Sequence, residues 1–263
     1  MPRSFQSAFS AAILSCALLQ LLLALPSQAQ SADPQTADPQ TVSTSRQRPS
    51  LSLEEQADLL MARGSYARAL DLYKQVEPRS PAVWNKMGTA YHHLFAVDEA
   101  LNDYKMAVAL NPHYAEAYNN IGAVYYSKRK YPAAEKAYKR ALRFRPDAAG
   151  TYLNLGTLYF AEGKYKQGAL AYQQAIKFDP EIFRTGKLQT VEEPASREQR
   201  MSTAFYLAEV YASAGRVDEA LASLRRALLD GFTDRKRLME DKELSSLRET
   251  TEFHQLLVQQ HLE

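Results

Sequence analysis

The feature that most constrains the fold of this chain is a repeat with a period of 34 residues. Proline, glycine and tyrosine each recur at that spacing over three consecutive copies. The recurring residues are Pro112, Pro146 and Pro180, then Gly88, Gly122 and Gly156, then Tyr91, Tyr125 and Tyr159. A chain of such copies is expected to stack similar units, because one copy cannot bury its apolar face alone.

Within each copy the residues follow one order. The first copy reads Trp84-x2-Met87-Gly88-x2-Tyr91, then Ala100-x3-Tyr104, then Pro112; the second reads Tyr118-x2-Ile121-Gly122-x2-Tyr125, Ala134-x3-Tyr138, Pro146; the third reads Tyr152-x2-Leu155-Gly156-x2-Tyr159, Gly168-x3-Tyr172, Pro180. This order resembles the tetratricopeptide repeat of the exported bacterial type. The resemblance implies an all-α fold, a right-handed α-solenoid of antiparallel helix pairs. It would hold about five repeats, three of them close to consensus, and a C-terminal helical cap.

The repeats and their flanks divide the chain into nine segments. They are a secretory signal peptide at 1–29, a disordered linker at 30–49, a degenerate repeat at 50–80, three repeats at 81–114, 115–148 and 149–182, an inserted loop and helix start at 183–200, a degenerate repeat at 201–234 and the helical cap at 235–263. Helices are expected at about 82–94, 98–110 and 197–213, and two short ones after Gly231. The patterns Ser52-x2-Glu55 and Ser196-x2-Gln199 predict capping boxes.

The recurring residues are expected to have structural roles in the repeats. Gly88 and Ala100 are small where two helices must cross closely, whereas the prolines end helices. Only Gly168 departs from the family pattern, where alanine is usual. The full set is Trp84, Gly88, Tyr91, Ala100, Pro112, Gly122, Tyr125, Ala134, Pro146, Gly156, Tyr159 and Pro180.

The first 29 residues have the order of a secretory signal peptide. Arg3 is their only charged residue, an apolar run extends from Ala8 to Leu25, and small residues precede a cleavage site after Ala29. This order predicts a periplasmic or secreted protein. One alternative is an uncleaved leader that anchors the chain in the inner membrane. Another is lipidation of Cys16, the single cysteine.

No motif for catalysis, a cofactor or a metal stands out. The chain has 32 basic and 30 acidic residues, a net charge of +2 that selects neither nucleic acid nor membrane. His92 and His93 are adjacent, so on a helix they point in different directions and chelate one metal poorly. Gly163-Lys164 lacks the spacing of a phosphate-binding loop, and Ser127-x2-Lys130 alone is a common pattern. We therefore expect no enzyme and no cofactor, although a small-molecule receptor or enzyme remains an alternative.

The resemblance places a binding groove along the first helices of the repeats. The residues expected to face neither the core nor a neighbouring helix are Asn85, Thr89, His92, Asn119, Ala123, Tyr126, Leu153, Thr157 and Phe160. His92, Tyr126 and Phe160 share one repeat column and would form an aromatic stripe. Asn120 and Asn154 share another column and are similar to the asparagine ladder that holds a peptide backbone in some family members.

The partner implied by this groove is another protein or a peptide, of unknown identity. Asn85, Glu116 and Asn154 stand where the family's chaperone-tail clamp has cations, so recognition of a C-terminal carboxylate in that way is not expected. The repeat at 115–148 is basic and offers a second contact for an anionic partner or lipid surface. With an uncleaved leader, the chain would instead be a membrane-anchored envelope assembly factor. The sequence does not indicate an oligomeric state.

Overall fold

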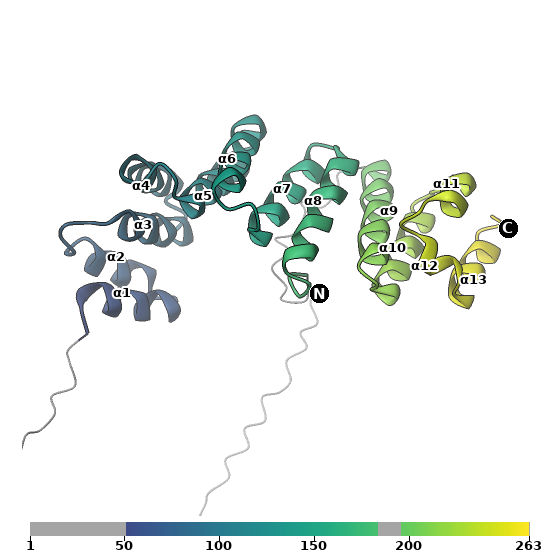
Figure 1. The fold of residues 1–263 in the computed structure, drawn as a ribbon, viewed down its shortest axis with the longest axis horizontal. Coiled ribbons are helices and arrows are strands. Elements are labelled where there is room, and N and C mark those ends of the chain that lie inside the picture. The colour runs from purple at the N-terminus through teal and green to yellow at the C-terminus, as the bar shows by residue number, and fades with distance from the viewer. Residues whose placement is uncertain (1–50, 184–195, 263) are drawn as a thin grey trace, which may run out of the picture. The chain divides into compact units, whose positions relative to one another are not determined.

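The computed structural model describes residues 51–183 and 196–262, and throughout these ranges the regular structure is α-helical (Figure 1). The expected signal peptide, the linker and residues 184–195 of the insertion lie outside the described residues. The helices are α1 (Leu53–Ala62), α2 (Tyr66–Tyr73), α3 (Pro81–His93), α4 (Val97–Leu110), α5 (Ala115–Ser127), α6 (Tyr131–Phe144), α7 (Ala149–Ala161), α8 (Tyr165–Phe178), α9 (Arg197–Ser213), α10 (Val217–Leu229), α11 (Arg235–Glu240), α12 (Ser245–Arg248) and α13 (Thr251–Gln259).

Consecutive helices pack as pairs, and each pair packs on the next. The pairs are α1 with α2, α3 with α4, α5 with α6, α7 with α8 and α9 with α10. The second helix of each pair contacts the first helix of the following one. In addition, α3 contacts α5 and α5 contacts α7, so three successive first helices lie side by side. The expected all-α fold of stacked helix pairs is confirmed.

The helix ends follow local signals in the sequence. Ser52 with Glu55, and Ser196 with Gln199, form the two predicted capping boxes, in which each side chain bonds the other residue's backbone N–H. Helix α9 has the predicted bounds, and α3 and α4 begin and end within one residue of the predicted windows. Pro81 and Pro132 lie in the first turns of α3 and α6, where a missing N–H does no harm.

In the three repeats closest to consensus, a glycine of the first helix packs against a tyrosine ring of the second. A methyl group on Gly88 would lie 2.7 Å from the Tyr104 ring, and one on Gly122 would lie 2.5 Å from the Tyr138 ring. These distances are too short for any real Cβ, so only glycine allows the two helices to approach this closely. This one contact, repeated three times, explains why Gly88, Gly122 and Gly156 and the tyrosines Tyr104, Tyr138 and Tyr172 each recur every 34 residues.

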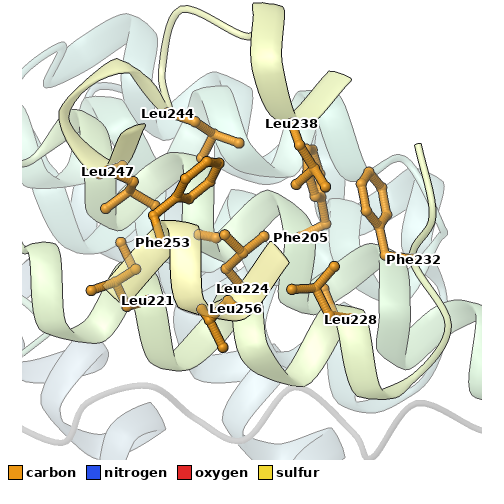
Figure 2. Packing of buried hydrophobic residues seen from close by; sticks show 14 of the residues in the cluster. Phe205, Leu221, Leu224, Leu228, Phe232, Leu238, Leu244, Leu247, Phe253 and Leu256 are labelled. Atoms are coloured by element: carbon orange, nitrogen blue, oxygen red, sulfur yellow. The ribbon is translucent and has the colours of Figure 1, made fainter. Parts of the chain in front are cut away.

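The C-terminal helices close the array on a continuous apolar core. Phe205 stacks on Phe232 with ring centroids 4.1 Å apart, and Leu238, Leu247 and Phe253 are fully buried beside them (Figure 2). The structure has three helices in this segment, so the prediction of two is wrong. The additional helix, α12, has only four residues and is too short to show a helical period.

The beginning of the insertion belongs to the core. Phe183 is buried, and its ring lies 5.2 Å from that of Tyr172 and 5.8 Å from that of Tyr211. The sequence predicts that Phe183 begins the inserted loop; the structure has it in a turn after α8, with its side chain buried rather than exposed. Through these two contacts the Phe183 ring packs against both α8 and α9.

Candidate functional site

Four asparagine side chains form a hydrogen-bonded chain across three first helices. The amide of Asn154 on α7 donates to Oδ1 of Asn119 on α5 at 3.0 Å. Asn119 donates to its neighbour Asn120 at 3.4 Å, and Asn120 donates to Oδ1 of Asn85 on α3 at 3.0 Å. Each of the three helices contributes at least one amide, and the donors follow one another from α7 to α3.

This amide chain lies in an open cleft of about 880 Å³, which we call the asparagine cleft. One side is formed by α3 and α5 and the other by the start of α7 with the turn before it. The lining residues are Asn85, Ala115, Glu116, Asn119, Asn120, Arg145, Asp147, Ala148, Ala149, Gly150, Thr151, Leu153 and Asn154. Arg145 and Glu116 pair at 2.9 Å across its edge. The cleft is therefore polar along its length and carries charge of both signs.

Five of the predicted groove residues line the asparagine cleft. They are Asn85, Asn119, Asn120, Leu153 and Asn154. The hydrogen bonds join residues 35 apart, Asn85 to Asn120 and Asn119 to Asn154, rather than residues within one 34-residue column. Grouping the asparagines by repeat column therefore misses that the two columns bond to each other.

Phe160 does not belong to a groove. It is 4% exposed, its ring stacks on Tyr172 at 5.1 Å, and a methyl group on Gly168 would lie 2.6 Å from it. The other two repeats have alanine, Ala100 and Ala134, in the column of Gly168. The Phe160 ring thus fills the space that an alanine side chain would take at residue 168. The prediction that Phe160 faces neither the core nor a neighbour is wrong.

Asn85, Leu153 and Thr157 are also buried, contrary to the prediction, although Asn85 and Leu153 still contribute to the lining of the asparagine cleft. The Thr157 hydroxyl donates to the Leu153 carbonyl at 3.0 Å and lies 3.0 Å from the hydroxyl of Tyr172. Thr89 repeats part of this arrangement, since its hydroxyl donates to the Asn85 carbonyl and accepts from Tyr104 at 3.3 Å. These threonines hold the tyrosine rings in place, and a hydroxyl satisfied in this way has a structural role.

His92 and Tyr126, the other members of the expected aromatic stripe, are half-buried and lie outside the lining of the asparagine cleft. Burial lowers the pKa of His92, so its imidazole is neutral at pH 7. The Tyr126 ring lies 5.9 Å from that of Tyr131. With Phe160 in the core, the structure does not form a continuous stripe from these three residues.

The basic repeat at 115–148 is partly paired. Lys128 bonds Asp98, Lys139 pairs with Glu135 at 2.6 Å, and the Arg140 guanidinium lies 4.5 Å from the centre of the Tyr118 ring. Exposed pairs of this kind contribute little to folding stability. They do place several cations on the α6 face and on the turn that precedes it.

The described residues hold no cluster of three or more metal-ligating side chains. Over the same ranges, no helix has both the length and the apolar character needed to cross a membrane.

A second polar cluster fastens α11 to α9. The Arg237 guanidinium pairs with Glu209 at 2.7 Å and lies 4.2 Å and 4.6 Å from the centres of the Phe205 and Tyr206 rings. Burial, together with the hydrogen bond to Asp241, raises the pKa of Glu209 to about 8. Glu209 is thus a protonated carboxyl below that pH, held between a cation and a second carboxylate.

This cluster makes stability depend on pH. The folded pKa of Glu209 lies above its ordinary value of 4.5, so its proton favours the folded state and that contribution is lost as pH rises towards 8. We expect the unfolding free energy to fall between about pH 5 and pH 8, by at most about 1.4 kcal/mol per pH unit. Chemical denaturation across this range should show a flatter profile for Glu209→Gln, whose amide keeps both hydrogen bonds. Identical profiles would contradict the assignment.

Comparison with known proteins places the repeats in one family. Models described as tetratricopeptide repeat match residues 115–148, 149–182 and 195–235, and one described as TPR repeat matches 96–129. No curated protein matches the chain.

Several solved structures match part of this chain. The crystal structure of MamA is 24% identical over 66% of this chain and 93% of its own, with a TM-score of 0.46. A thermophilic TPR protein of Thermus thermophilus is 24% identical over 78% and 97%, with a TM-score of 0.47. The first TPR of Spaghetti (RPAP3), bound to an HSP90 peptide, is 29% identical over 42% and 90%, with a TM-score of 0.41.

Proposed function

Because this chain belongs to the tetratricopeptide repeat family, we propose that it is a non-catalytic scaffold that binds a protein or peptide in the asparagine cleft. The observation that carries the proposal is the chain of four amides across α3, α5 and α7. Among the residues that line the cleft, no two side chains are arranged as a nucleophile and its general base. The cleft is therefore assigned to recognition.

Three of the four amides, those of the half-buried Asn119, Asn120 and Asn154, keep hydrogen-bonding capacity for a ligand. A primary amide has two N–H donors and an oxygen with two lone pairs, whereas the chain uses at most one donor and one lone pair of each asparagine. An extended peptide offers alternating donors and acceptors, which such amides can match. The mutual bonds also hold the side chains in place before binding, so little side-chain entropy is lost.

The charges of the cleft indicate how a peptide would be held. Arg145 already pairs with Glu116, and Asp147 is exposed on the same edge. Asn85 and Asn154 bond other asparagines at positions where the chaperone-tail clamp has cations. The cleft thus favours an internal, extended segment over a chain end with a free carboxylate.

The ladder can be tested by removing two amides. The variant Asn120→Ala, Asn154→Ala is expected to lose at least about fivefold in affinity for its partner, since each of the two lost hydrogen bonds contributes about 0.5–1.5 kcal/mol. Capture from native cell extract, quantified against the unaltered protein, measures this loss. The matched control is Asn102→Ala, an exposed asparagine on α4. Equal capture by the unaltered protein, the double variant and the control would show that the partner does not bind in the cleft.

Export forms a second part of the proposal. The leader at 1–29 supports secretion with cleavage after Ala29, which leaves a mature chain that begins at Gln30. The intact mass of the protein isolated from its native cells decides this point. Loss of 29 residues is expected, and a full-length mass would instead favour the membrane-anchored form.

A further inference from the structure

The five turns that join the helices of each pair share one backbone geometry. In the turn after α3, the Ala96 N–H bonds the Tyr91 carbonyl and the Phe95 N–H bonds the His92 carbonyl, both at 3.0 Å. The other four turns have the same two bonds, which define a Schellman motif. Its central residue has positive φ in every copy. These residues are Gly64, Phe95, Arg129, Gly163 and Gly215, with φ values of 71°, 60°, 55°, 74° and 70°.

Phe95 and Arg129 are the two members of this series that carry a side chain, and Phe95 is the apolar one. Left-handed backbone is unfavourable for a residue with a side chain, and glycine fills the position in three of the five turns. The Phe95 side chain gains nothing from the fold in return, because it is 89% exposed. Leu94 beside it is 41% exposed. An apolar side chain held at an unfavourable backbone position and presented to solvent points to a role outside folding.

A basic turn lies against the start of the helix that follows this apolar tip. The equivalent turn of the next repeat is Lys128-Arg129-Lys130, and Lys128 bonds Asp98 in the first turn of α4. Lys130 also acts electrostatically on Asp98, so the basic turn lies against the helix start that follows Phe95. We refer to Leu94, Phe95 and Lys128–Lys130 together as the turn edge.

The shape and charge of the turn edge indicate its partner. Phe95 is almost fully exposed at the tip of a turn, so it is suited to enter a partner rather than to receive one. Because the basic turn lies beside Phe95, the partner must carry negative charge next to the place where the Phe95 ring enters. The headgroup region of an anionic bilayer fulfils both conditions without a preformed pocket, since aromatic rings insert there and cations contact the phosphates.

We propose that the turn edge docks the protein on an anionic lipid surface, with Phe95 inserted and Lys128–Lys130 in contact with lipid phosphates. This contact is independent of the asparagine cleft, whose lining includes none of the residues of the turn edge. It leaves the cleft free to hold a partner while the scaffold rests on a membrane, whether or not the leader is retained.

The test is sedimentation with vesicles of phosphatidylcholine, with and without phosphatidylglycerol, at low ionic strength. The protein used begins at residue 30, because the apolar leader would bind lipid itself; all hydrophobic clusters of the described residues lie beyond that point. Binding is expected only to the anionic vesicles and should weaken with salt. Phe95→Gly should lower the partition coefficient at least about fivefold, while thermal stability is unchanged or higher because strain is removed.

Charge variants give effects of opposite sign. Lys128→Gln, Lys130→Gln should weaken binding, by about fivefold for each cation, whereas Asp98→Asn should strengthen it because it releases Lys128. The matched control is Leu229→Ala, an apolar side chain that is 66% exposed on another pair and should bind unchanged. Unchanged binding by Phe95→Gly, or equal binding to neutral vesicles, would overturn the proposal. Absence of binding to any vesicle would overturn it as well. If the unaltered protein then captured another protein and Phe95→Gly did not, the turn edge would be a protein contact instead.

Discussion

Phe160→Ala is expected to lower the free energy of unfolding by about 3–5 kcal/mol, the usual cost of removing a buried phenylalanine. The ring is 4% exposed and contacts Tyr172 and the backbone at Gly168. Urea denaturation of the chain from residue 30 measures the change. A loss below about 1 kcal/mol would show that the side chain faces solvent, as the sequence had suggested.

The same contact predicts a reversal of sign at residue 168. Gly168→Ala alone should destabilise the protein, since the added methyl group would lie 2.6 Å from the Phe160 ring. In the Phe160→Ala background that space is empty, and the same change should stabilise by about 1 kcal/mol through helix propensity. A double-mutant cycle gives the coupling directly. Additive effects would contradict the packing described for this repeat.

The second large effect is expected at Gly156. Its Cβ would lie 2.3 Å and 2.5 Å from two atoms of the Tyr172 ring and 3.2 Å from the Gly168 carbonyl oxygen. Tyr172 is fully buried and bonded to Thr157, so the ring has no space into which it can move. Gly156→Ala should therefore destabilise by about 1–3 kcal/mol, as overpacked cores do.

Gly150 provides the matched control on the same helix. A methyl group there has no heavy atom within 4 Å, so Gly150→Ala should be neutral or stabilise by up to about 1 kcal/mol. Thermal unfolding of both variants, with calorimetry, compares one glycine required by packing with one that is not. Equal effects at the two positions would show that α7 and α8 do not approach as closely as described.

Most of the fold was predictable from the sequence, because each repeat column is one physical contact seen several times. The glycine and tyrosine columns are the crossing of the two helices, and the serine patterns are capping boxes. The segment after Gly231 was less predictable. Its apolar residues are buried as expected, but α12 is a single turn whose helical form depends on the surrounding core.

The site was only partly predictable, for identifiable reasons. Whether Phe160 faces a groove or the core depends on Gly168, which lies on another helix and whose departure from alanine makes room for the ring. The asparagine bonds join residues 35 apart, which a search at period 34 does not pair. Phe95 was missed because hydropathy does not report backbone conformation, although its column holds glycine two repeats later, at Gly163.

Photo-crosslinking from inside the asparagine cleft tests the central claim most directly. Gly150 lines the cleft and has open space at its Cβ, so Gly150→p-benzoylphenylalanine places a reactive group there without disturbing the core. The control carries the same group in place of Ala222, an exposed residue of α10. In native cells, we predict one crosslinked protein from position 150, absent from position 222 and lost with Asn120→Ala, Asn154→Ala. No crosslink at 150, or the same product from both positions, would contradict binding in the cleft.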